Sequence, residues 1–151
     1  MKLFTRILSI FIILFILASC TTTNSSCPVT EPEWLLAPDD PAINNPPAYG
    51  HYFVNDDHSI WASAWWTDSE YSKFSEIENG VKVGWFRPAG AEITVTGQKL
   101  DGDAPAIESD FPCCYPTRFQ ASGLYFPSGG CWEVNARAED KSLTFVIWIE
   151  P

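Results

Sequence analysis

Hydrophobic and polar residues alternate with a period of two over most of the chain beyond residue 48. The clearest run spans residues 142–149, where Leu143, Phe145, Ile147 and Ile149 fall on one face. This alternation is the pattern of a strand with one buried and one exposed side. Similar runs predict seven strands, at residues 50–54, 59–66, 81–87, 91–100, 119–126, 131–138 and 142–149.

Turn-forming residues separate these runs. Pro88-Ala89-Gly90 and Ser128-Gly129-Gly130 each precede a predicted strand, and Ala138-Glu139-Asp140-Lys141 links the last two as a hairpin. Only residues 68–78 carry aromatic and aliphatic side chains at helical spacing, and they predict a loop with one or two turns of helix. Short strands without intervening helices favour an all-β fold, a β-sandwich formed by residues 48–151.

Residues 20–47 differ from the strand-rich part. They begin as a polar spacer and continue with prolines at 28, 32, 38, 41, 46 and 47. Proline fixes φ and lacks a backbone donor, so neither a regular helix nor a central strand is expected. We expect an extended tether and N-terminal segment that leads into the domain or runs along it.

The first 19 residues have the character of an export signal. Lys2 and Arg6 precede about twelve apolar residues, too few for a membrane span of roughly 20. The ending Leu17-Ala18-Ser19-Cys20 resembles the lipobox of bacterial lipoproteins. The resemblance implies cleavage before Cys20 and attachment of acyl chains such as palmitate to that cysteine. It predicts an extracytoplasmic protein anchored in a bacterial membrane, the outer one in a Gram-negative cell, because Thr21 replaces the usual retention aspartate.

The charge narrows the range of partners. Removal of residues 1–19 leaves seven basic residues against nineteen acidic ones, a net charge of −12. Binding to nucleic acid depends on Lys and Arg that neutralise phosphates, so nucleic acid is excluded as a partner. The expected partners are the membrane, through the lipid on Cys20, and an envelope protein or glycan.

Four cysteines remain once Cys20 is assigned to the lipid, namely Cys27, Cys113, Cys114 and Cys131. Disulfides are expected in an exported protein. Four cysteines allow three pairings, and their spacing alone does not choose among them.

Several segments resemble a functionally uncharacterised domain of bacterial exported proteins and lipoproteins. The most specific is Gly130-Cys131-Trp132-Glu133-Val134, and residues 27–30, 84–87, 93–102, 119–127 and 142–146 also match. The resemblance implies an immunoglobulin-like sandwich without assigned activity and a Cys27–Cys131 bridge. Cys113 and Cys114 have no counterpart in that domain. Within the motif, Trp132 and Val134 share a face and are expected in the core, with Cys131 on the opposite face.

Tryptophans supply the candidate binding surface. Strand alternation would place Trp61 and Trp65 on one face and Trp66 on the other, so one face should carry exposed aromatic area. Together with Tyr71, these residues are the predicted contacts for protein or glycan.

The histidines and cysteines indicate an alternative function. His51, Asp56 and His58 have side chains that suit first-row metals, but the spacing matches no known metal motif. The alternative is therefore a small extracytoplasmic metal-binding or redox protein that uses His51, His58, Cys113 and Cys114.

Catalytic signatures are weak. No Gly-x-Ser-x-Gly elbow is present, and the paired carboxylates Asp101/Asp103 and Glu108/Asp110 lie in polar turn-like segments. We therefore expect a protein that is not an enzyme and needs no cofactor: a lipid-anchored binding or structural module of the cell envelope.

Overall fold

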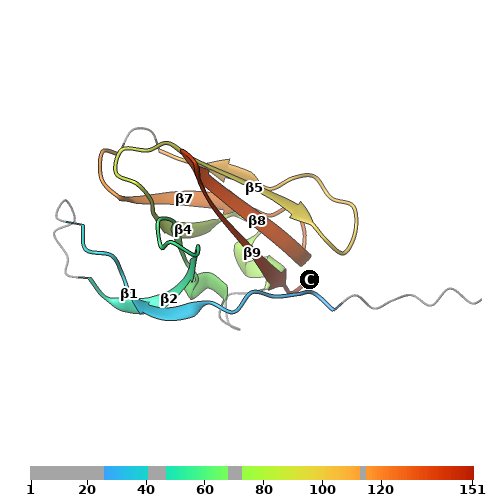
Figure 1. Ribbon diagram of the computed structural model, residues 1–151. Helices are drawn as coiled ribbons and strands as arrows, with labels where there is room; N and C mark the ends of the chain where they lie inside the picture. The colour runs from blue at the N-terminus through green and yellow to red at the C-terminus, as the bar shows by residue number, and fades with distance from the viewer. Residues whose placement is uncertain (1–25, 41–46, 68–72, 113–114) are drawn as a thin grey trace, which may run out of the picture.

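The prediction of an all-β sandwich is confirmed. The computed structural model describes residues 26–40, 47–67, 73–112 and 115–151. They form two antiparallel sheets that pack face to face around one hydrophobic core (Figure 1).

The described residues contain nine strands and two short helical segments. In chain order they are β1 (Glu33–Leu36), β2 (Tyr49–Val54), β3 (Trp61–Ser63), η1 (Trp65–Thr67), α2 (Phe74–Ile77), β4 (Val81–Phe86), β5 (Ile93–Lys99), β6 (Glu108–Asp110), β7 (Phe119–Tyr125), β8 (Gly130–Ala138) and β9 (Lys141–Ile149). The larger sheet has the strand order β1-β2-β3-β4-β7-β6, and the smaller sheet has the order β5-β8-β9.

Seven of these strands form an immunoglobulin-like framework. The order β3-β4-β7-β6 opposite β5-β8-β9 is that of a constant-type immunoglobulin domain, with four strands facing three. The hairpin of β1 and β2 is an addition that extends the larger sheet beyond β3. β1 and β6 were not among the strands predicted from the sequence.

The core follows from the alternation of the strands. The inward-facing residues Leu143, Phe145, Ile147 and Ile149 of β9 are all buried, as predicted. Phe53 of β2 stacks on Phe145, with ring centroids 4.1 Å apart, and so joins the added hairpin to the smaller sheet. The sandwich therefore has one continuous core.

An N-terminal strap closes one side of the sandwich. We use this name for residues 27–32, which begin at the disulfide between Cys27 and Cys131. The disulfide confirms the pairing that the resemblance implied. The backbone of Thr30 donates to the carbonyl of Val146 at 2.8 Å, and its hydroxyl accepts from the backbone of Val146 at 2.9 Å. The strap thus covers the edge strand β9 before the chain enters β1 (Figure 1).

The remaining local predictions concern a helix and a turn. The segment with helical spacing contains the single turn α2. Gly130 enters β8 with φ of 127°, a conformation that favours glycine, as expected for the sharp turn before that strand. Within the described part of the chain, no helix combines the length and apolar character needed to cross a membrane.

Candidate binding site

The seven tryptophans divide into two groups. Four are buried, and each donates its indole N–H to a protein acceptor: Trp61 to the His58 carbonyl, Trp66 to the Ser63 carbonyl, Trp85 to the Ser122 hydroxyl and Trp132 to the Ser128 carbonyl. The other three are exposed, Trp34 by 61%, Trp65 by 51% and Trp148 by 43%. The buried group stabilises the fold, so only the exposed tryptophans are available to contact a ligand.

The predicted surface of Trp61, Trp65 and Trp66 is therefore wrong for two of its members. β3 ends at Ser63 and the chain turns into η1 at Trp65, so the alternation that placed these side chains is interrupted. Trp61 packs edge-on against Tyr52 and His58, and Trp66 packs against Phe126. Only Trp65 is exposed, and Tyr71 lies outside the described residues.

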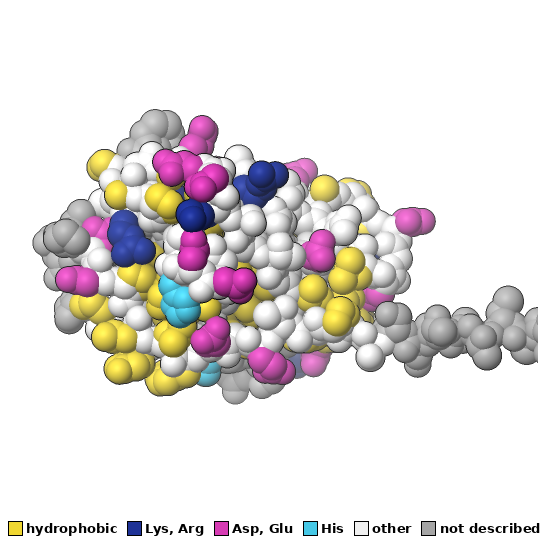
Figure 2. Space-filling view, viewed as in Figure 1, with side chains coloured by type: hydrophobic (Ala, Val, Ile, Leu, Met, Phe, Trp, Pro, Cys, Tyr) yellow, Lys and Arg dark blue, Asp and Glu magenta, His cyan; other side chains and the backbone are white. Residues whose placement is uncertain are grey.

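A larger exposed cluster lies on the added hairpin. In the register of β1 and β2, Trp34 is opposite His51 and Leu36 is opposite Tyr49. Opposite residues of an antiparallel pair project from the same face. These four exposed side chains, which we call the aromatic face, lie on the hairpin at the lower left of Figure 2, where hydrophobic side chains gather.

The rings of the aromatic face have a defined arrangement. Trp34 and Tyr49 are nearly parallel, with an interplanar angle of 13° and centroids 6.2 Å apart. His51 meets Trp34 edge-on at 4.8 Å. The indole thus has an aromatic neighbour on two sides while more than half of its surface remains exposed to solvent.

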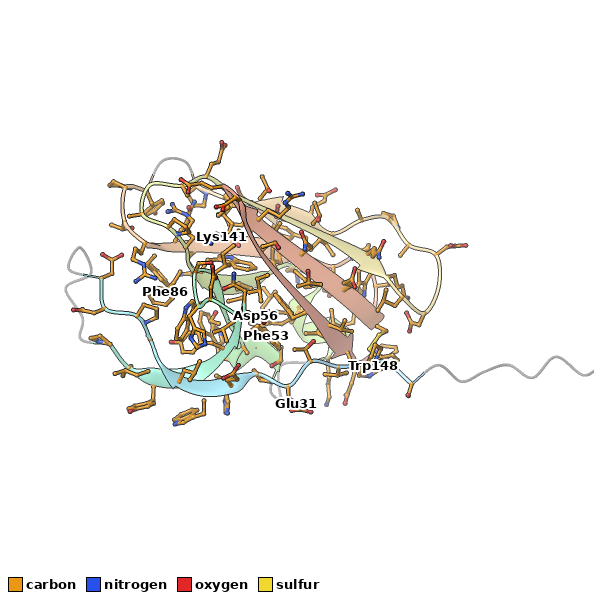
Figure 3. All side chains as sticks on the ribbon, viewed as in Figure 1. Glu31, Phe53, Asp56, Phe86, Lys141 and Trp148 are labelled. Carbon is orange, nitrogen blue, oxygen red and sulfur yellow. A yellow bond between two sulfur atoms is a disulfide. The ribbon has the colours of Figure 1, made fainter. Side chains whose placement is uncertain are left out.

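A cleft of about 440 Å³ continues from this face toward β9. It lies among the strap, β2, η1 and the C-terminal end of β9, with the lining residues Val29, Thr30, Glu31, Pro32, His51, Phe53, Thr67, Ile147, Trp148 and Glu150. Figure 3 shows Glu31 on the strap, with Phe53 and Trp148 nearby. Because His51 belongs to both, the aromatic face and the cleft form one continuous surface.

The candidate metal ligands do not come together. His51 packs against Trp34 of β1, whereas His58 packs against Trp61. In the described ranges, no group of three or more His, Cys, Asp or Glu side chains is arranged to hold a metal ion. Cys113 and Cys114, the other half of that alternative, lie outside them.

Asp57 and the paired carboxylates singled out in the sequence are not among the residues that line the cleft. The Lys141 ammonium donates to Asp57 at 2.7 Å and so joins the β8–β9 hairpin to the β2–β3 loop. Within that loop, Asp57 also accepts hydrogen bonds from the hydroxyl of Ser59 at 2.5 Å and from its backbone N–H at 3.1 Å. These bonds hold the pKa of Asp57 well below its usual range, and the same carboxylate raises the pKa of Lys141. Of the paired carboxylates, Asp101 lies 4.0 Å from Lys99, and Glu108 and Asp110 are exposed on the edge strand β6.

A second cavity, of about 610 Å³, lies beside the buried Arg87. The guanidinium makes five hydrogen bonds, two to Gln120 Oε1 and one each to the carbonyls of Pro88, Tyr115 and Thr117. A guanidinium has five N–H donors, so none is left for a ligand. Burial lowers the pKa of Arg87, whose role here is to hold the loop that leads into β7.

Comparison of the chain with protein-family models, with curated proteins and with solved structures gave no match.

Proposed function

We propose that this protein is a lipid-anchored, non-catalytic binding module of the bacterial cell envelope that takes its ligand on the aromatic face. The observation that carries the proposal is the hairpin of β1 and β2. It lies outside the seven-strand framework and displays Trp34, Leu36 and Tyr49 to solvent. Isolated exposed apolar residues are ordinary, whereas a contiguous group marks an interaction site.

The anchor is consistent with this role. Cys20 precedes the strap by only seven residues, and an extended chain covers roughly 3.3–3.6 Å per residue. A lipid on Cys20 would therefore hold the domain within about 25 Å of the membrane surface. Attachment by two or more acyl chains is stable, so the module would stay at the envelope without a spanning helix.

Photocrosslinking on intact cells tests the proposal. We expect a benzophenone amino acid in place of Trp34 to form adducts, because this position faces the ligand. The same group in place of Trp65, a tryptophan of similar exposure that belongs to neither the aromatic face nor the cleft lining, should form none. With Cys20→Ser, the protein should leave the membrane fraction and the Trp34-position adduct should weaken. Adducts at position 65 alone, or at neither position, would exclude the aromatic face as the binding surface.

A further inference from the structure

We infer that the ligand of the aromatic face and the cleft is an uncharged polysaccharide chain. This inference rests on the proposed function and specifies the ligand class of the same site.

The shape of the surface favours a narrow ligand. A stable protein interface buries about 800 Å² per partner and involves about 20–30 residues on each side. The aromatic face has four residues and the cleft lining has ten, which makes thirteen because His51 belongs to both, and this is fewer than such an interface uses. A single polymer strand, one sugar wide, can occupy this face and continue into the open cleft beside it.

The chemistry of the surface suits both the apolar face and the hydroxyl groups of a sugar ring. A pyranose presents an apolar C–H face and a rim of hydroxyl groups. The nearly parallel rings of Trp34 and Tyr49 offer flat apolar area for the C–H face, and Trp148 offers a second such area at the far side of the cleft. Glu31 and Glu150, which also line the cleft, supply carboxylates that can accept hydrogen bonds from hydroxyls.

Charge decides which polysaccharides are suitable. No lysine or arginine is among the residues that line the cleft, and its charged lining residues are Glu31 and Glu150. The backbone of Lys73 bridges to Glu150, which places one exposed lysine beside the cleft but not in it. The chain that begins at Cys20 has a net charge of −12 as well, so uronic acid and phosphate polymers are repelled.

Native affinity electrophoresis of the full lipidated protein in neutral detergent tests the inference. The gels contain one soluble polysaccharide each: hydroxyethylcellulose, xyloglucan, galactomannan or glycol chitin as neutral probes, and alginate or polygalacturonate as anionic ones. We expect at least one neutral probe to retard the protein and neither anionic probe to do so. The double substitution Trp34→Ala with Tyr49→Ala should weaken the retardation at least tenfold, and Trp65→Ala should leave it unchanged. Glu31→Gln should weaken it severalfold.

Three results would overturn the inference: retardation by anionic probes, retardation by none of the probes, or equal retardation of the double variant. A failure here is separable from failure of the proposed function. If the crosslinker at position 34 captures a protein while no polysaccharide retards the chain, the binding face stands and the glycan inference fails. Because Trp34 and Tyr49 are exposed, their variants should keep the thermal midpoint of the unmodified protein, which is measured alongside.

Discussion

Replacement of Cys27 and Cys131 together by serine is expected to lower the free energy of unfolding by about 3–5 kcal/mol. The bridge joins residues 104 positions apart. A crosslink that closes a loop of about 100 residues restricts the unfolded chain by roughly 4.7 kcal/mol in the chain-entropy model. Since domains of this size are stable by about 5–15 kcal/mol, the loss is a large share of the total.

The same substitution should also loosen the strap. Without the bridge, residues 27–32 are held to β9 mainly by the hydrogen bonds between Thr30 and Val146. The strap leads directly into β1, so its release is expected to weaken the aromatic face and the cleft as well as the fold.

Urea unfolding followed by tryptophan fluorescence measures the effect. Cys27→Ser alone removes the same crosslink and should unfold at the same urea concentration as the double variant, which provides an internal control. If the double variant unfolds at the same urea concentration as the unmodified protein, the bridge does not have this structural role.

Substitution of Trp132 by alanine is expected to cost about 3–5 kcal/mol of stability. The side chain is fully buried, packs edge-on against Phe126 with centroids 5.7 Å apart, and donates its indole N–H to the Ser128 carbonyl at 3.0 Å. Alanine would leave a cavity in the core and remove the donor of that carbonyl. Trp132→Phe keeps an aromatic ring and should lose less.

Trp148→Ala is the matched control for this prediction. Trp148 lies on the neighbouring strand β9, is close to half exposed, and projects from the outer side of the smaller sheet. Its removal should change the free energy of unfolding by less than about 1 kcal/mol. If Trp132→Ala destabilises no more than Trp148→Ala in urea unfolding, the interpretation of the Gly-Cys-Trp-Glu-Val segment as a packing motif is wrong.

The alternation of the sequence was enough to predict most strands. β9 is the clearest case, since its four hydrophobic residues two apart share one face of a strand and are all buried. The motif residues also behave as expected: Trp132 and Val134 face the core, and Cys131 on the opposite face carries the strap.

Two edge strands could not be predicted from alternation. β6 consists of Glu108, Ser109 and Asp110, all exposed, so its sequence has no hydrophobic face to recognise. β1 is a four-residue run between Pro32 and Pro38, and proline argues against a central strand. β1 is indeed an edge strand, and edge strands tolerate proline.

The candidate binding face was missed for a related reason. Its residues come from two segments, of which residues 33–36 fell in the part assigned to the tether. Only the non-local register that places Trp34 opposite His51 brings them together. The signal in the sequence was a tryptophan, Trp34, inside a proline-rich segment, because a tether has no core in which an indole could be buried.

Indole N–H signals provide the most direct test of the central claim that the aromatic face is where this protein binds. In nitrogen-15 spectra of Cys20→Ser protein, each of the seven tryptophans contributes one such signal. On addition of a solubilised envelope extract from the producing cells, the Trp34 signal should shift or broaden, with a smaller change at Trp148. Trp65 and the four buried indoles should stay in place. A change at Trp65 with Trp34 unaffected would contradict the account.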